Sequence, residues 1–275
     1  TKAASDALDV PYEPKQWPRT LHTELVEGLN RAGARTIIFD LLFAQDRGEA
    51  DGAFAAAIKA AGNVVLLEFL EKRIAEVAGT ANQGAAVLRR VPPTASIAAA
   101  ALATAPFTLP KVPLQVAQFW TFDRNAGDAV SLPLAALLVY AGPSFAALLE
   151  VIEAGVPDIA GQRVAPATSS GGARVAIHAA ETLAAALRRS PRLAEEILHR
   201  ADDADVVLRD RRLVESVLAA VADPPSRYLN FYGPPGSIPN IPYNAVIQGG
   251  SATVSEAAAS VSTSTLADPW RTRGS

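Results

Sequence analysis

Residues 34–43, with the sequence ARTIIFDLLF, form a nearly continuous apolar run that is typical of a β-strand covered on both faces. A second apolar run follows at residues 64–69. An amphipathic helix is predicted before the first run, over residues 20–31, and another helix separates the two runs, over residues 51–61. The order helix, strand, helix, strand with short connections predicts parallel strands. We therefore expect an α/β fold in which a mostly parallel central sheet is flanked by helices.

The rest of the chain adds more helices than strands. Residues 71–113 are rich in alanine and interrupted by several prolines, and their pattern leaves the local elements open. Residues 115–122 predict a strand and residues 123–128 a turn, while residues 161–172 are polar and glycine-rich without a phosphate-binding motif. Helices are predicted over residues 132–140, 144–153, 182–189, 191–199 and 211–222. We therefore expect the fold to contain an Ala-rich helical insertion.

Composition excludes several classes of function. The chain has 275 residues, of which 49% are hydrophobic and 19% charged, as expected of a folded domain with a substantial core. The net charge of −3 gives no basic field, so we expect no nucleic-acid partner. Cysteine is absent and only three histidines are present, which excludes disulfides and thiolate nucleophiles. We therefore expect no metal site and no cofactor.

The two ends of the chain differ from its middle. Methionine is absent and the chain starts at Thr1, so we expect an excised or processed segment of a longer protein. No run reaches the roughly 20 apolar residues of a membrane span, and no signal peptide is recognisable. After Gly250 the composition changes to serine, threonine and alanine. We expect one domain over residues 1–250 and a disordered or non-native tail over residues 251–275.

A short aromatic strand with a sharply specified turn is predicted near the end of the domain. In residues 228–232, YLNFY, polar-tipped side chains alternate with plain apolar ones, which is the pattern of a strand. The sequence GPPG follows at residues 233–236, where two prolines fix φ and Gly236 supplies the positive φ that a type II turn requires. No catalytic motif accompanies this turn.

Five segments of the chain together resemble a known family. They read WPR-x-LH at residues 17–22, GAR-x-I-x-FD-x-x-F at 33–43, AGNVVL at 61–66, NFYGPPG-x-I at 230–238 and IPY-x-x-VI at 241–247. In this order they resemble the CHASE domain of the second type, over residues 4 to about 249. The family is an extracellular sensory domain of bacterial adenylate or guanylate cyclases, histidine kinases and serine/threonine kinases.

The resemblance implies a sensor without catalytic activity of its own. It implies an extracytoplasmic position, periplasmic or extracellular, in a cell-membrane receptor whose output module lies inside the cell. The implied partners are a small-molecule or environmental stimulus, a second receptor chain in a homodimer, and the membrane through flanking helices that this chain does not carry. Two alternatives stay open: an α/β enzyme with a site on the loops after Phe43 and Phe69, and a structural dimerisation module.

Three candidate ligand-binding residues lie at the start of the first predicted helix. Trp17 and Arg19 belong to the WPR-x-LH segment, and His22 follows them closely. His22 is a candidate ligand contact or pH-responsive group, since histidine titrates near neutral pH. The alternative is that it caps or borders the helix.

Three further candidates lie on or near predicted strands. Asp40 is a carboxylate within an apolar run, at the end of a strand where α/β sheets bind ligands, or else an acceptor for nearby backbone N–H groups. Asn230 and Tyr232 present polar groups on the aromatic strand. They are candidates for ligand contact, and the alternative for Asn230 is a buried amide that fixes the adjacent turn.

Overall fold

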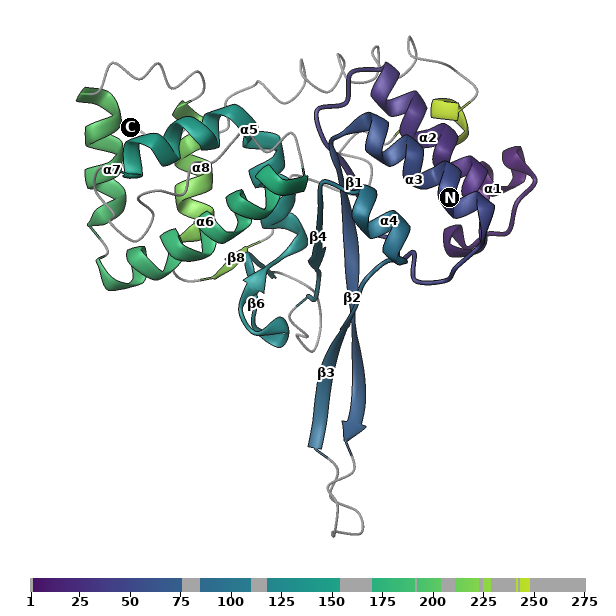
Figure 1. Ribbon diagram of the computed structural model, residues 1–275, viewed down its shortest axis with the longest axis horizontal. Coiled ribbons are helices and arrows are strands. Elements are labelled where there is room, and N and C mark those ends of the chain that lie inside the picture. The colour runs from purple at the N-terminus through teal and green to yellow at the C-terminus, as the bar shows by residue number, and fades with distance from the viewer. Residues whose placement is uncertain are drawn as a thin grey trace, which may run out of the picture.

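A small parallel sheet lies between two helical layers, as the ribbon of the computed structural model shows (Figure 1). The structure describes residues 2–75, 85–109, 118–153, 170–190, 192–203, 211–222, 225–228, 241 and 243–247. The parallel strands are β1 (Ile37–Phe39), β2 (Val64–Ala75) and β4 (Ala103–Pro106), with β2 in the middle. The helices are α1 (Lys2–Leu8), α2 (Arg19–Arg31), α3 (Glu49–Ala61), α4 (Ala95–Ala100), α5 (Leu132–Glu153), α6 (Ser170–Arg189), α7 (Leu193–Asp203) and α8 (Arg211–Val221). The predicted α/β class is confirmed.

The side-chain alternation of β2 divides the interior into two cores. Val64 and Leu66 point to one face of the sheet and pack with α2, α3 and α4. Val65 and Leu67 point to the other face and pack with α5, α6, α7 and α8. This is the two-residue period of a strand that is buried on both sides. The alanine-rich helices of the second layer are the Ala-rich helical part of the fold.

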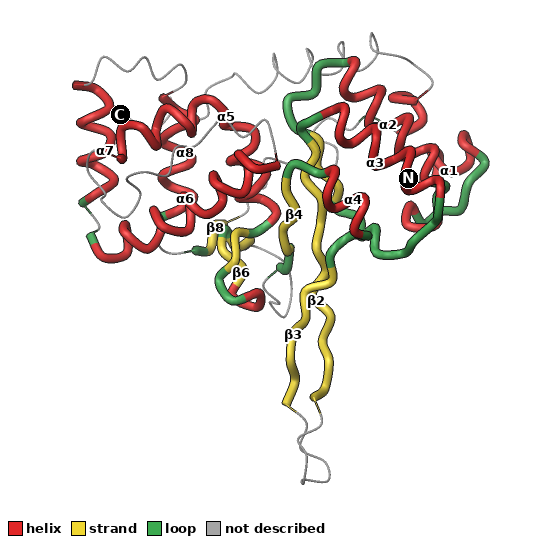
Figure 2. The backbone as a smooth tube through the Cα atoms, viewed as in Figure 1, coloured by secondary structure: helices red, strands yellow, loops and turns green. Residues whose placement is uncertain are grey.

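The far half of β2 leaves the body of the protein in a long hairpin. Its residues from Phe69 to Ala75 pair antiparallel with β3 (Ala85–Val91). Figures 1 and 2 show this two-stranded ribbon projecting away from both helical layers. In residues 71–113, for which the sequence left the elements open, the described parts are mainly strand, and α4 is the one helix among them.

The first predicted strand is shorter and less covered than its sequence indicates. Only Ile37–Phe39 of residues 34–43 is extended as β1, and among the described strands it pairs with β2 alone. Ile38 is 50% exposed, so the second face of this strand is not covered. The expectation of a central strand covered on both faces is therefore wrong. The apolar side chains of Leu41 and Leu42 belong to the loop that follows.

The helices of the second layer lie where helices are predicted, but α6 begins at Ser170 and not at residue 182, so the end of the glycine-rich stretch at 161–172 is helix. Residues 132–140 and 144–153 form α5, which bends at Gly142 with φ of 40°. No single helix in the described residues is long and apolar enough to cross a membrane; only Leu132–Gly142 and Ser144–Glu150, joined across a bend of 87°, meet that criterion as a pair. Side chains of both halves of this pair, including Leu134 and Leu148, are buried in the core.

Small strands complete the second layer. β5 (Gln118–Trp120) pairs antiparallel with β8 (Ser226–Tyr228), and β6 (Phe122–Asp123) pairs with β7 (Ala129–Val130). The predicted turn at 123–128 contains the short 3-10 helix η2 (Arg124–Ala126). The GPPG turn, most of the glycine-rich stretch at 161–172 and the 251–275 tail lie outside the described residues.

Candidate functional site

A buried ion pair fixes the start of α2 against α3. The Arg19 Nε donates to Asp51 Oδ1 at 2.7 Å, and the two side chains are only 2% and 4% exposed. Arg19 also donates through an Nη to the Gln45 carbonyl at 3.0 Å, and its guanidinium lies 4.8 Å above the Phe43 ring. These contacts tie α2 to the loop between β1 and α3.

Arg47 fastens the same loop to the segment before α2. Its two terminal nitrogens donate to the carbonyls of Trp17, at 2.6 Å, and Lys15, at 2.8 Å. Its backbone N–H donates to Asp51 Oδ2 at 3.0 Å. Asp51 therefore receives one hydrogen bond on each oxygen, which compensates the cost of burying its charge. The carbonyl of Lys15 belongs to the short 3-10 helix η1 (Pro14–Gln16).

His22 connects α2 to residues 243–247, which form a single helical turn. Its Nδ1 lies 2.7 Å from the Tyr243 hydroxyl, although the two residues are 221 positions apart in the sequence. The Trp17 ring meets the Tyr243 ring edge-on, with centroids 4.9 Å apart. His22 is 0% exposed, and its Nε2 has no hydrogen-bond partner in the described residues. The imidazole also contacts the rings of Phe39, Phe43 and Phe54.

The surroundings of His22 favour its neutral form. The pKa of His22 is lowered from 6.5 to about 4, mainly by burial and also by the positive charges of Arg19 and Arg47, while the Pro14 carbonyl, as a hydrogen-bond acceptor, acts in the opposite direction. Burial also raises the pKa of Tyr243, so its phenol stays protonated. The phenol therefore donates to Nδ1, and Nε2 carries the ring proton. The Pro14 carbonyl is the acceptor near the ring, although no hydrogen bond of regular geometry joins it to Nε2.

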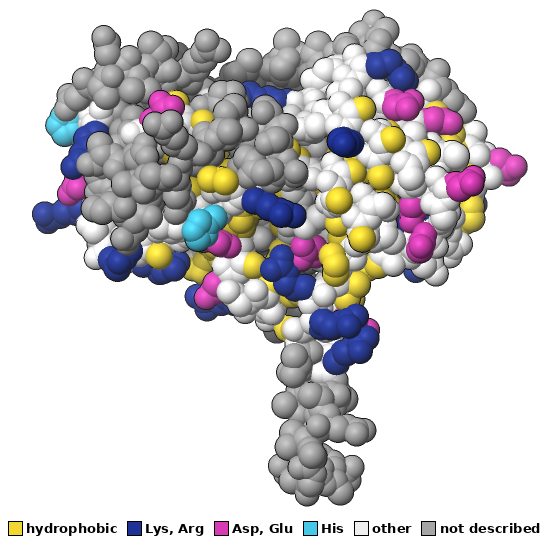
Figure 3. All heavy atoms as spheres, viewed as in Figure 1, with side chains coloured by type: hydrophobic (Ala, Val, Ile, Leu, Met, Phe, Trp, Pro, Cys, Tyr) yellow, Lys and Arg dark blue, Asp and Glu magenta, His cyan; other side chains and the backbone are white. Residues whose placement is uncertain are grey.

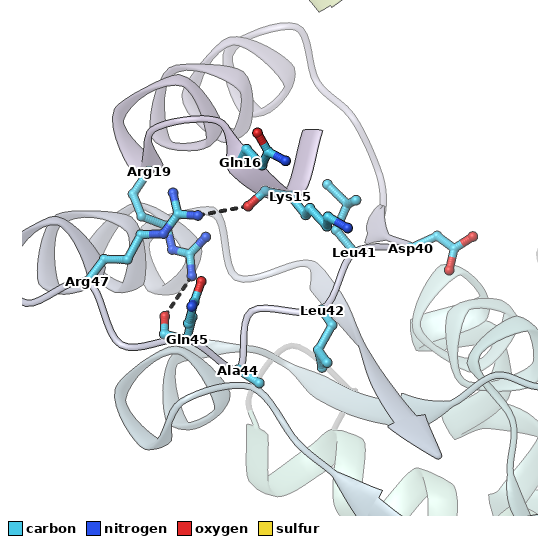
Figure 4. A pocket seen from close by; sticks show the side chains of 9 residues that line it. All are labelled: Lys15, Gln16, Arg19, Asp40, Leu41, Leu42, Ala44, Gln45 and Arg47. Atoms are coloured by element: carbon cyan, nitrogen blue, oxygen red, sulfur yellow. Dashed lines mark hydrogen bonds between the residues drawn. The ribbon is translucent and has the colours of Figure 1, made fainter. Parts of the chain in front are cut away.

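An open cavity of about 510 Å³ lies beside this cluster, at the carboxyl end of β1. It is lined by Lys15, Gln16, Arg19, Asp40, Leu41, Leu42, Ala44, Gln45 and Arg47. Figure 4 shows Arg19 and Arg47 at one end of the cavity and Asp40 at the other, with its carboxylate pointing away from them. The lining thus contains three basic residues and one acid. The hydrogen bonds of Arg19 and Arg47 described above already engage both guanidiniums within the protein.

The structure brings three of the six candidate residues together. Trp17, Arg19 and His22 are all buried at the start of α2, bonded to protein groups, so they hold the fold together at this point. Asp40 is exposed and lines the cavity at a distance from them. Asn230 and Tyr232 lie outside the described residues.

Arg47 and Tyr243 make hydrogen bonds in the candidate site but were not predicted as site residues from the sequence. Arg47 stands in a loop without local periodicity, so nothing near it in the sequence indicates its role. Tyr243 belongs to the IPY-x-x-VI segment, and that segment was the available signal. Only the fold shows that this segment meets WPR-x-LH.

The described residues contain no metal-binding set of side chains. No group of three or more His, Cys, Asp or Glu side chains among them is placed to hold a metal ion. Asp40 is the one acid lining the cavity after Phe43, where the enzyme alternative calls for convergent acids. The loop expected after Phe69 does not exist, because β2 continues to Ala75 and Phe69 lies within the strand. That expected site position is wrong.

The comparison with protein families decides the family. The model of the CHASE2 domain matches residues 4–267, nearly the whole chain. The chain belongs to the CHASE2 family. CHASE2 domains are extracellular sensory domains of signalling proteins. Comparison with curated proteins and with solved structures gives no match.

Proposed function

We propose that this CHASE2 domain is the extracytoplasmic sensor of a bacterial transmembrane receptor that regulates a cytoplasmic adenylate or guanylate cyclase or a protein kinase. The observation that carries this proposal is the family match over residues 4–267. The domain senses a small-molecule or environmental stimulus and catalyses no reaction itself. Two receptor chains act together as a homodimer, and membrane helices that flank the domain carry the signal inward.

The contact between α2 and residues 243–247 supports this role. It joins a segment near the beginning of the domain to a segment near its end through His22 and Tyr243. In a receptor whose membrane helices attach on both sides of the domain, a stimulus has to favour one of two arrangements of these segments. A stimulus that strengthens or opens this contact changes how the two ends are held relative to one another.

Labelling of a single introduced cysteine tests the location. The domain contains no cysteine, so Tyr12→Cys, at a residue 69% exposed, adds one thiol to this part of the receptor. In intact cells that produce the whole receptor, a membrane-impermeant maleimide should label this variant, with the unsubstituted receptor as the control. Labelling that appears only after cell lysis contradicts an extracytoplasmic domain.

The output needs a separate measurement. Membranes that contain the whole receptor should form cyclic nucleotide or incorporate phosphate from ATP, depending on the output module. A receptor with neither activity under any condition contradicts the proposed regulation of a cyclase or kinase. The dimerisation module remains the alternative, and a receptor that stays monomeric in detergent at high concentration counts against it.

A further inference from the structure

His22 is a buried polar side chain whose hydrogen bonds are incomplete, an arrangement that the stability of the fold does not require. His22 is completely buried, and yet its Nε2 has no hydrogen-bond partner among the described residues. An unsatisfied buried polar group costs about 1–3 kcal/mol, so a wholly apolar side chain would serve better as a packing residue. The group also lies at the contact between α2 and the turn at 243–247. His22 is therefore unfavourably buried and lies at the contact between α2 and residues 243–247.

We propose that acidification opens the contact between α2 and residues 243–247, and that His22 is the group that takes up the proton. The use of this opening as a signal rests on the proposed receptor function. The opening itself is a property of the domain.

The charged groups around His22 make its protonation costly in the closed arrangement. Arg19 comes from α2 itself, and Arg47 from the loop between β1 and α3; both are positive. Asp51 of α3 is the nearby acid, and it is already hydrogen-bonded to both arginines. The remaining neighbours are the phenol of Tyr243, which is uncharged, and the Pro14 carbonyl, which favours the protonated ring but carries no full negative charge. No described group in this set offers an unpaired negative charge to an imidazolium.

Protonation of His22 is unfavourable because it buries a positive charge, and not because a hydrogen bond is lost. The Tyr243 hydroxyl can turn and accept a proton from Nδ1, because a phenol both donates and accepts. Of the rings around His22, Phe43 already has the Arg19 guanidinium over its face. Water is the remaining source of stabilisation for the charge, and water reaches His22 when the contact opens.

The turn at 243–247 is the element that can move. It is a single helical turn, and Tyr243 and Val246 pack it against the core around α2. The other neighbours of His22 belong to α2, β1, α3 and their connecting loops, which are held by the buried Arg19–Asp51 pair and by Arg47. Opening at the turn leaves these hydrogen bonds in place.

The direction of the pH effect follows from the pKa of His22, which is about 4 in the closed arrangement against an ordinary value of 6.5. Above pH 6.5 the group is neutral in both arrangements, and the contact has its full stability. Between pH 6.5 and pH 4 only the opened arrangement binds the proton, so the contact weakens as the pH falls. With the ordinary value restored on opening, the opening equilibrium constant rises roughly 20-fold between pH 7 and pH 5.

Hydrogen exchange on the purified chain measures this opening directly. After correction for the intrinsic pH dependence of exchange, the protection of residues 243–247 should fall roughly 20-fold from pH 7 to pH 5. The His22→Gln variant should lack this fall. The matched control is His178→Gln, at a side chain 67% exposed, which should behave like the unsubstituted chain. An equal loss of protection in the unsubstituted chain and in His22→Gln overturns the proposal.

A measurement without any substitution at His22 covers the case in which that variant does not fold. In an NMR titration of the unsubstituted chain, the His22 ring should stay neutral until the 243–247 turn loses protection. A His22 ring that titrates near pH 6.5 while the turn stays protected overturns the proposal. Both experiments use the chain in solution, so their failure leaves the receptor location, tested by cysteine labelling, unaffected.

Discussion

Gly28 of α2 lies directly against Val246, so that any side chain at position 28 would meet the turn at 243–247. A Cβ at Gly28 would come within 3.3 Å of both Val246 Cγ1 and the Val246 carbonyl oxygen. Contacts this short require the neighbour to move. The close approach of the two segments therefore depends on a glycine in the interior of a helix, where alanine is otherwise the better residue.

Gly28→Ala should weaken the contact between α2 and the turn. Alanine in a helix interior gains about 1 kcal/mol over glycine, whereas overpacking costs about 1–3 kcal/mol. The matched control is Gly52→Ala in α3, where a Cβ meets no atom within 4 Å. Urea denaturation should show stabilisation by Gly52→Ala and none by Gly28→Ala, with lower exchange protection at 243–247 only in the latter. Equal stabilisation by both variants would show that the turn yields without cost.

Arg19→Ala should be among the most damaging single substitutions in the domain. It leaves the Asp51 carboxylate, 4% exposed, without its ion-pair partner, and removing one member of a buried pair costs about 3–5 kcal/mol. Arg31→Ala on the same helix is the control, because its 3.8 Å pair with Glu27 is exposed. We expect a loss of less than about 1 kcal/mol there. Similar denaturation midpoints for the two variants would contradict a structural role for Arg19.

The apolar pattern of the first 70 residues was sufficient to predict α2, α3 and the buried half of β2. The pattern did not predict elements whose stability depends on a partner far away in the sequence. Glu71, Lys72 and Arg73 are polar and look like the end of a strand, and yet β2 continues through them because β3 supplies the hydrogen bonds. The apolar run at 34–43 predicted a covered strand, although the second helical layer leaves Ile38 exposed.

In the candidate site, too, the sequence indicates the local segment but not its distant partners. The sequence singled out Trp17, Arg19 and His22, and the structure places them together at the start of α2. Their partners could not be predicted from the sequence, because Asp51 has no distinctive local pattern and the segment that contains Tyr243 does not indicate what it contacts. The role of the three residues as ligand contacts stays a prediction.

Tyr243→Phe should separate the hydrogen bond of this contact from its packing. The phenylalanine ring keeps the edge-on contact with Trp17, while the buried His22 loses the donor to its Nδ1. We expect a loss of about 1–2 kcal/mol in the free energy of unfolding. Tyr140→Phe, at a ring 44% exposed, is the control and should change little. No difference between the two variants would mean that the 2.7 Å contact adds nothing to stability.

Arg90→Ala should loosen the root of the projecting hairpin. Glu68 is 6% exposed and accepts from Arg90 Nε at 2.6 Å and from the Thr104 hydroxyl at 2.5 Å, so it joins β3 and β4 to β2. Without Arg90, one oxygen of a buried carboxylate is unpaired, at a cost of about 1–3 kcal/mol.

The neighbouring residue provides the control for this last prediction. Arg89 lies 3.6 Å from Glu71, and both side chains are well exposed, so Arg89→Ala should cost less than about 1 kcal/mol. Figure 3 shows basic side chains gathered where the hairpin leaves the body. Each of the two variants removes one positive charge, so they change the net charge equally. Hydrogen exchange of β3 should therefore increase in Arg90→Ala and stay unchanged in Arg89→Ala. If both variants release β3 equally, the hairpin is held by surface charge and not by the buried Glu68.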